Sequence, residues 1–147
     1  MKLAILGSGF IARFYADALV GQRRKDVLTN VYSRTLSNAK KFAEDYKVPK
    51  HTASISECVN DPDVDAVIIA LSNDMHLESV LACAAAGKHV LCTKPLGRTA
   101  QEAMQMLQAV EKANVTGGYL EDLVYSPKSL KSLATTQAGS IGEVIWT

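Results

Sequence analysis

A glycine-rich turn near the start of the chain constrains the fold more than any other feature of the sequence. The apolar run Leu3-Ala4-Ile5-Leu6 leads directly into Gly7-Ser8-Gly9-Phe10-Ile11-Ala12, a GxGxxA pattern that opens an amphipathic segment. A strand, a tight turn and a helix in this order are typical of the first unit of dinucleotide-binding folds. The sequence therefore predicts an α/β fold with a nucleotide site at its first turn.

The small residues of this turn each have a physical role. Gly7 permits the tight turn out of the strand, Gly9 leaves the backbone open to a pyrophosphate, and Ala12 allows the helix to pack closely on the sheet. The unpaired N–H groups at the helix start, at Phe10 and Ile11, together with the positive end of the helix dipole, favour an anion. Since no Gly-Lys-Ser/Thr ending follows, a P-loop is disfavoured.

Length and composition favour one globular domain. The chain has 147 residues, 48% of them hydrophobic, and a net charge of +1, so nothing indicates binding to nucleic acid or to an anionic membrane. We interpret the cationic cluster Arg23-Arg24-Lys25 as a solvated loop. Cys58, Cys83 and Cys92 lie in apolar patterns without metal-binding spacing, which is typical of reduced thiols in a cytoplasmic protein and predicts no metal site.

Strand and helix signals alternate along most of the chain. The expected strands span residues 3–6, 27–32, 50–53, 64–71, 89–92 and 115–119. Apolar spacing predicts the buried faces of the helices between them: Ile11, Phe14, Tyr15, Ala18 and Leu19; then Leu36, Ala39, Ala43 and Tyr46; then Leu77, Val80, Leu81, Ala84 and Ala85; and last Ala103, Met106, Leu107 and Val110. The alternation predicts a doubly wound parallel sheet of the Rossmann type with right-handed crossovers.

The last part of the chain differs in character. Ser126-Pro127 resembles an N-cap followed by proline at the first helical position, and it predicts a polar helix that runs toward Gly139. A strand is expected to begin within 141–147. We interpret residues 1–120 as a dinucleotide-binding Rossmann domain, and 121–147 as the connecting helix and first strand of a truncated second α/β domain that is otherwise absent.

Three further segments give the sequence a family resemblance. They are Val64 to His76, Ala86 to Pro95 and Gly139 to Val144. With the opening turn, in this order and spacing, the chain resembles the Gfo/Idh/MocA family of NAD(P)-dependent oxidoreductases. The resemblance covers essentially the whole chain but only the N-terminal half of a usual member, which continues into an open-faced sheet domain that carries much of the substrate pocket.

The resemblance implies roles for the matching residues. Asn73 and His76 match a Pro-Asn-x-x-His segment in which Ser72 stands where proline is usual. Lys94-Pro95 matches the end of a Glu-Lys-Pro motif in which Thr93 replaces the glutamate. In family members this lysine lies beside the nicotinamide and the substrate hydroxyl, so it is the expected catalytic residue. The alternative is an ordinary surface lysine at a strand end.

The choice of cofactor depends on the end of the second expected strand. An NAD enzyme usually places Asp or Glu about 20 residues past the phosphate turn, where the carboxylate binds the ribose hydroxyls. Here the chain has Ser33-Arg34-Thr35. No carboxylate would repel a 2′-phosphate, and a guanidinium could bind it or stack on adenine, so we expect NADP. The alternative is that Arg34 is an exposed loop residue and that both cofactors bind.

These arguments combine into one expected site and function. The expected cofactor-binding residues are Gly7, Gly9, Phe10, Ile11, Ala12, Ser33, Arg34, Leu71, Ser72, Asn73, His76, Lys94 and Pro95. The resemblance implies an oxidoreductase that transfers hydride between nicotinamide and a sugar, polyol or related carbinol or carbonyl substrate, as a homo-oligomer when full-length, with a proton acceptor from the missing domain. The alternative is a non-catalytic NAD(P)-binding module or regulatory fragment.

Other polar residues have simpler expected roles. Asp74 and Glu78 are interpreted as helix-capping or surface acids, because acids are favourable at a helix start. His51 and His89 are interpreted as structural. Glu121-Asp122 follows the last sheet strand, where family members approach the active-site cleft, so we expect it near the substrate.

Overall fold

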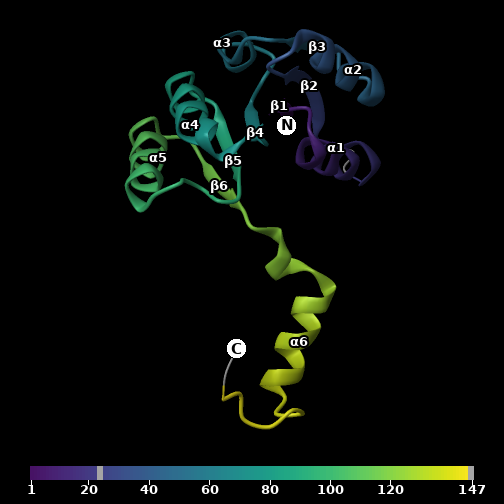
Figure 1. Ribbon diagram of the computed structural model, residues 1–147, viewed down its shortest axis with the longest axis vertical. Coiled ribbons are helices and arrows are strands. Elements are labelled where there is room, and N and C mark those ends of the chain that lie inside the picture. The colour runs from purple at the N-terminus through teal and green to yellow at the C-terminus, as the bar shows by residue number, and fades with distance from the viewer. Residues whose placement is uncertain (23–24, 146–147) are drawn as a thin grey trace.

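The computed structural model describes residues 1–22 and 25–145, of which those up to Leu120 form one sheet with helices on both faces (Figure 1). The strands are β1 (Lys2–Leu6), β2 (Val27–Tyr32), β3 (Lys50–Thr52), β4 (Ala66–Ile69), β5 (His89–Thr93) and β6 (Gly117–Leu120). The helices are α1 (Phe10–Gln22), α2 (Leu36–Tyr46), α3 (Ile55–Val59), α4 (His76–Ala85), α5 (Ala100–Lys112) and α6 (Pro127–Gln137), with short 3-10 turns η1 (Asn73–Met75) and η2 (Asp122–Tyr125).

The sheet has the strand order β3-β2-β1-β4-β5-β6, and every neighbouring pair is parallel. This is the order of the Rossmann fold, so the predicted fold class is confirmed. The order reverses between β1 and β4, which pair from Leu3 with Ala66 to Leu6 with Ile69. Because all strands run the same way, their carboxyl ends share one edge, and ligands of such sheets bind where the order reverses.

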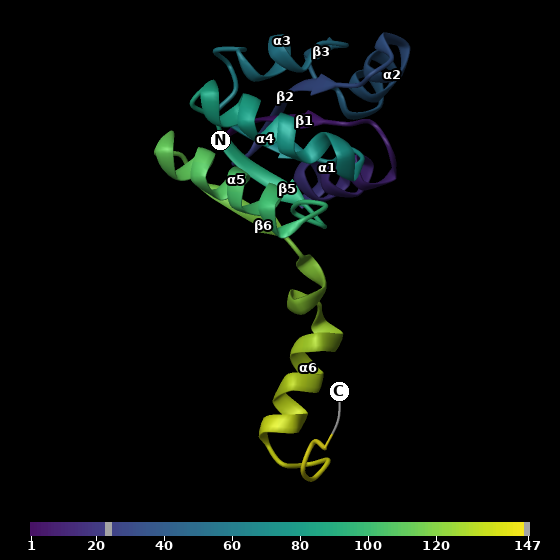
Figure 2. The same ribbon diagram turned by 60° about the vertical axis from the view of Figure 1, so that its left-hand side comes forward.

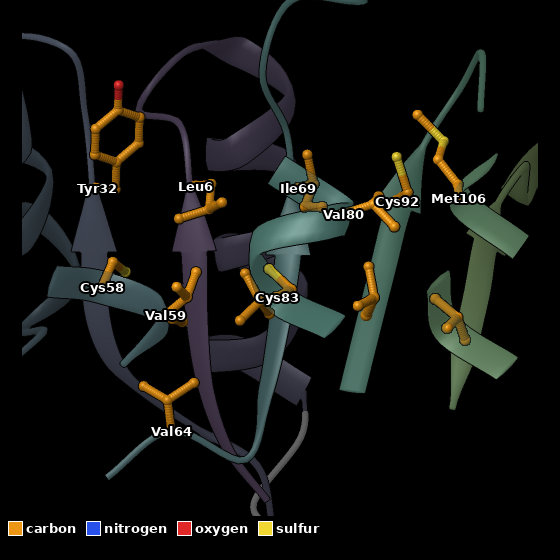
Figure 3. Close-up of a cluster of buried hydrophobic side chains, with 14 residues drawn as sticks. Leu6, Tyr32, Cys58, Val59, Val64, Ile69, Val80, Cys83, Cys92 and Met106 are labelled. Atoms are coloured by element: carbon orange, nitrogen blue, oxygen red, sulfur yellow. The ribbon is translucent and has the colours of Figure 1, made fainter. Parts of the chain in front are cut away.

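Helices cover the sheet from both sides. One apolar cluster joins the sheet to α1 and α2, and a second joins it to α3, α4 and α5. Figure 3 shows the second cluster, in which side chains of the strands and of the helices meet in one layer: Leu6, Tyr32, Cys58, Val59, Val64, Ile69, Val80, Cys83, Cys92 and Met106. Burial raises the pKa of its three cysteine thiols to about 12, and all three are free.

The buried face of α1 differs from the predicted one. Ala12, Ala16 and Leu19 are buried, whereas Phe14 is 51% exposed and Ile11 is 38% exposed. The reason is side-chain size, because two alanines one turn apart let the helix backbone lie close to the strands. This close approach turns the phenylalanine away from the sheet, so the prediction for Ile11 and Phe14 was wrong.

The later helices show smaller differences of the same kind. On α4 the buried face carries His76, Ser79, Val80, Cys83 and Ala84. Leu81 and Ala85, which were predicted on that face, are exposed, as is Leu107 on α5. The spacing of apolar residues predicted these helices correctly, but their buried faces differ from the predicted ones. The reason is that small and polar side chains also pack against the sheet.

The end of the chain lies apart from the sheet. Ser126 caps α6, as predicted, with its Oγ accepting a hydrogen bond from the Ser129 N–H. In both views α6 extends away from the strands (Figure 1, Figure 2). Residues 141–145 form no strand, because no strand of the sheet lies beside them to share hydrogen bonds; the rest of that predicted strand, Trp146 and Thr147, lies outside the described residues.

Two other predictions are not settled by the described residues. Arg23 and Arg24 of the cationic cluster are not among the described residues, and Lys25 is exposed. The proposed division of the chain at residue 120 stays a prediction. Among the described helices, none combines the length and the apolar character that crossing a membrane requires.

Candidate functional site

A cleft of about 260 Å³ lies at the carboxyl edge of the sheet, where the strand order reverses between β1 and β4. The loops after β1, β2 and β4 form its walls. Its lining residues are Gly7, Ser8, Gly9, Tyr32, Ser33, Arg34, Ala70, Leu71, Ser72, Asp74 and Met75. The first turn, the end of the second strand and the loop after the fourth strand therefore come together as the sequence predicted.

The two glycines of the first turn differ in what surrounds them. Gly7 has a φ of +121°, and its N–H donates to the Tyr32 carbonyl at 2.8 Å. A Cβ at this position would overlap the Ala70 carbonyl oxygen. A Cβ at Gly9, in contrast, would meet no atom within 4 Å. Gly7 is thus required by the protein itself, whereas Gly9 faces open space that a ligand can approach.

The N-terminus of α1 follows directly after Gly9, which lines the cleft, whereas Phe10, Ile11 and Ala12 are not among the lining residues. Its first intrahelical hydrogen bond runs from the Arg13 N–H to the Gly9 carbonyl at 3.0 Å. The N–H groups of Phe10, Ile11 and Ala12 therefore have no partner within the helix. The first turn of α1 carries no acidic residue. The predicted contribution of Phe10 and Ile11 is a backbone one, whereas Ala12 was predicted to allow close packing on the sheet and is fully buried. A helix start of this kind suits a diphosphate.

The end of β2 gives the cleft its polar side. The Ser33 side chain is buried, and its Oγ lies 2.8 Å from the Ser8 Oγ. Arg34 is exposed in the wall of the cleft. This wall carries a hydroxyl and a guanidinium at the position where an acidic residue would bind ribose hydroxyls.

Asp74 lies in the wall contributed by the loop after β4. A hydrogen bond from the Ser72 hydroxyl lowers the pKa of the Asp74 carboxyl, with further contributions from its own backbone N–H and from Arg98 and Arg34. The sequence analysis interpreted Asp74 as a capping or surface acid and did not predict that it lines the cleft. The signal available was its position within the segment that matches Pro-Asn-x-x-His.

Lys94 and Pro95 lie on the adjacent loop, after β5, and both are exposed. Thr93, which stands in place of the family glutamate, is 6% exposed, and its Oγ1 donates to the Ile69 carbonyl at 3.0 Å. This position therefore contributes a hydrogen bond between β4 and β5 in place of a carboxylate. Neither Lys94 nor Pro95 lines the cleft described above.

Asn73 and His76 begin the turn and helix after β4, and they differ in exposure. Asn73 is exposed, whereas His76 is fully buried and does not line the cleft. The His76 Nδ1 lies 2.8 Å from the Pro95 carbonyl oxygen, and its Nε2 lies 3.2 Å from that of Leu71. Its predicted contact with a cofactor stays a prediction, and the observed partners of its ring are backbone atoms of two loops.

The remaining polar residues lie elsewhere. His89 Nδ1 accepts a hydrogen bond from the Thr116 N–H at 2.9 Å, as fits a structural histidine. Burial raises the pKa of Tyr15 on α1, and the nearby carboxylates of Asp122 and Glu121 raise it further. In residues 1–22 and 25–145, no three His, Cys, Asp or Glu side chains form a group that could hold a metal ion.

Comparison with known proteins fits this geometry. The profile of the Gfo/Idh/MocA family, described as an oxidoreductase family with an NAD-binding Rossmann fold, matches residues 1–119. A 1,5-anhydro-D-fructose reductase of Ensifer adhaerens is 35% identical over 117 residues, which are 80% of this chain and 35% of that protein. A trans-1,2-dihydrobenzene-1,2-diol dehydrogenase of Mus musculus is 34% identical over 127 residues, 86% of this chain and 37% of that protein.

A solved structure described as an NAD binding oxidoreductase of Klebsiella pneumoniae has a similar fold. It superposes with a TM-score of 0.83 at 31% identity, over 97% of this chain and 40% of that one. The chain thus spans little more than a third of the length of the curated relatives named above. With the cleft, the glycine turn and the strand order all in agreement, the chain belongs to the Gfo/Idh/MocA family of oxidoreductases.

Proposed function

We propose that this chain is the cofactor-binding part of an NADP-dependent oxidoreductase that acts on a sugar, polyol or related carbinol or carbonyl substrate. The observation that carries the proposal is the cleft itself, which combines the glycine turn with the Ser33-Arg34 pair and lies beside the N-terminus of α1. The open space at Gly9 fits a diphosphate. The bound nicotinamide cofactor would supply the hydride donor or acceptor.

The preference for NADP rests on charge at the end of β2. The exposed guanidinium of Arg34 can pair with a 2′-phosphate, and the Ser33 hydroxyl can donate to it. The carboxylate of Asp74 also lines the cleft, and the charges of Arg98 and Arg34 contribute to the lowering of its pKa. The family profile describes NAD binding, so the same cleft in relatives does not by itself decide between the two cofactors.

Lys94 is the proposed catalytic residue of this chain. It follows β5 at the carboxyl edge of the sheet, the same edge at which the cleft opens. From there its ammonium group would orient the hydroxyl or carbonyl oxygen of the substrate and stabilise charge that develops on it. The substrate class is supported by the names of relatives, which include a reductase of 1,5-anhydro-D-fructose.

Titration of the chain with NADPH and with NADH, followed by cofactor fluorescence, tests the proposal. We expect tighter binding of NADPH by about tenfold or more, the scale of one charge-assisted hydrogen bond. Replacing Ser33→Asp should reverse the preference, because a carboxylate there accepts ribose hydroxyls and repels a phosphate. Equal affinities for both cofactors would contradict the NADP assignment, and no binding of either would contradict the whole proposal.

A second candidate is a non-catalytic NAD(P)-binding module. It is favoured by Thr93, whose hydroxyl is used within the sheet where the family motif has a carboxylate. A fusion of this chain to the remaining part of the 1,5-anhydro-D-fructose reductase, beyond the 35% that it matches, separates the two candidates, because it supplies a substrate domain. With NADPH and 1,5-anhydro-D-fructose, oxidation of NADPH that Lys94→Ala abolishes supports the enzyme, whereas binding of NADPH without oxidation supports the module.

A further inference from the structure

His76 is a fully buried titratable residue that the proposed function does not use. It is the first residue of α4 and lies beneath the carboxyl edge of the sheet. Its two ring nitrogens both point at backbone carbonyl oxygens, Pro95 at 2.8 Å and Leu71 at 3.2 Å. Both partners are acceptors, so the ring binds either of them only by donating an N–H, and a neutral ring donates to one of them at a time.

The two carbonyls belong to different loops of the candidate site. Leu71 follows β4 and lines the cleft, whereas Pro95 follows β5 and is bonded directly to Lys94. The strands beneath them are paired up to Ile69 and Cys92, and the Thr93 hydroxyl adds a bond to the Ile69 carbonyl. Beyond that point, among the described residues, the hydrogen bonds that join residues 70–75 to residues 94–98 are those of the His76 ring.

The contact to Pro95 is the shorter of the two and defines the main link. A neutral imidazole carries one N–H, and with the proton on Nδ1 it donates to the Pro95 oxygen. Because the His76 ring is buried, water does not compete for this hydrogen bond, and the bond constrains the position of Pro95 more strongly. The loop that carries Lys94 is therefore tied to the start of α4 in addition to the end of its own strand.

We propose that His76 is a positioning residue that fixes the Lys94 loop against the loop that lines the cleft. This inference rests on the proposed function, which places the cofactor in the cleft and Lys94 at its reacting end. His76 then acts on the Lys94 loop through the Pro95 carbonyl. A shift of about 1 Å in a reacting group can cost on the order of a hundredfold in rate, so such a tie matters for catalysis.

Two variants of His76 separate positioning from general stability. His76→Phe keeps an aromatic ring of similar size but removes both donors, and His76→Asn places an amide N–H near the position of Nδ1. Ser79→Ala is the matched control, because Ser79 is buried on the same helix and its Oγ has no hydrogen-bond partner in the described structure. Thermal unfolding of each variant shows whether it is folded.

Two NMR measurements on the full chain provide the readout. The heteronuclear NOE of the backbone N–H groups of Lys94, Leu96 and Gly97 reports the order of the loop without cofactor. The ¹³C signal of reductively methylated Lys94, assigned with Lys94→Arg, reports the response of its side chain to NADPH. Cofactor fluorescence measures binding in the same samples.

We expect His76→Phe to lower the NOE of the loop in the absence of cofactor and to abolish the NADPH response of Lys94. His76→Asn should restore both signals, and Ser79→Ala should leave them unchanged. A loop in folded His76→Phe as ordered as in the parent would overturn the inference, as would an Asn variant no better than the Phe variant. Failure of the parent chain to bind NADPH would instead refute the proposed function, since the loop order is measured without cofactor.

Discussion

The two glycines of the first turn are chemically identical but have opposite surroundings. Gly7 combines a positive φ with a carbonyl directly in the path of any Cβ, whereas Gly9 borders open space. The sequence motif has glycine at both positions and does not distinguish their roles. The structure shows that one glycine serves the packing of the chain, and it leaves the other free to serve a ligand.

We therefore predict different outcomes for the two alanine variants. Gly7→Ala should lower the free energy of unfolding by about 2–4 kcal/mol, because backbone strain and overlap with the Ala70 carbonyl add together. Gly9→Ala should change it by less than about 1 kcal/mol, as expected for a helix N-cap position, but should weaken NADPH binding. Urea unfolding followed by circular dichroism, with cofactor fluorescence, measures both. Equal stabilities of the two variants would contradict this assignment.

Among the secondary-structure elements, the sequence predicted where strands and helices form better than it predicted which face of each helix is buried. The range predicted for β2 agrees with Val27–Tyr32, because a run of apolar and β-branched residues between polar segments has one good interpretation. The face of α1 was less predictable. Apolar spacing favoured Phe14, but the close contact of Ala12 and Ala16 with the strands decided the rotation, and that contact depends on the position of the sheet.

On the side of the sheet where β1 and β3 begin, polar and charged side chains connect three strands with the segment that precedes β4. The Lys50 Nζ, at the start of β3, lies 2.8 Å from the Asp61 Oδ1 and 2.9 Å from the Asp63 Oδ2. The Lys2 Nζ, in β1, lies 2.9 Å from the Asp63 Oδ1. Asp61, just before β4, also accepts a hydrogen bond from Asn30 of β2 at 2.9 Å. This network links elements that are far apart in sequence, so no local pattern indicated it.

The network predicts loss of stability in acid. Hydrogen bonds from Lys2 and Lys50 lower the pKa of Asp63 from 3.8 to about 2. Burial alone would raise the pKa of Asp61, but its bonds with Lys50, the Asp63 N–H and Asn30 lower it on balance. Since the unfolded chain binds these protons more readily, the stabilisation is present above about pH 4 and is lost as the pH falls toward 2.

Urea unfolding between pH 2 and pH 8 checks this prediction. Asp63→Asn should reduce the fall in stability below about pH 4, because the replaced group no longer takes up a proton. Asp61→Ala should lower the free energy of unfolding by about 1–3 kcal/mol at neutral pH, since it leaves the buried Asn30 amide without its acceptor. A variant Asp63→Asn with the acid sensitivity of the parent would show that other carboxylates dominate.

For the whole molecule, the sequence predicted the fold and several residues that line the candidate cleft, but it did not predict all of the lining residues. Gly7, Gly9 and Ser33 could be assigned because the phosphate turn and the strand that follows are close in sequence. The place of Asp74 in the wall depends on how β4 crosses beside β1, which alternation alone does not determine. The burial of His76 likewise required knowing that the loops after β4 and β5 meet above it.

The position of the last helix leads to a prediction about the chain as a whole. No residue beyond Leu120 belongs to either apolar cluster of the described structure, and α6 lies away from the sheet (Figure 2). Leu130 and Leu133 of α6 are 51% and 54% exposed, and Ile145 is 90% exposed. Apolar side chains gathered on one exposed segment favour association with other surfaces.

We therefore expect that a chain ending at Tyr125 folds as well as the full chain and associates less with itself. Its free energy of unfolding in urea should lie within about 1 kcal/mol of the parent value, because the removed residues bury no part of the core. Sedimentation velocity should show a smaller fraction of oligomer, and the double substitution Leu130→Ser with Leu133→Ser in the full chain should have the same effect. A shortened chain that unfolds much more easily would show that α6 contacts the sheet in solution. Unchanged association in both variants would place the contact surface on the Rossmann sheet and its helices, where Phe10 and Phe14 are also exposed.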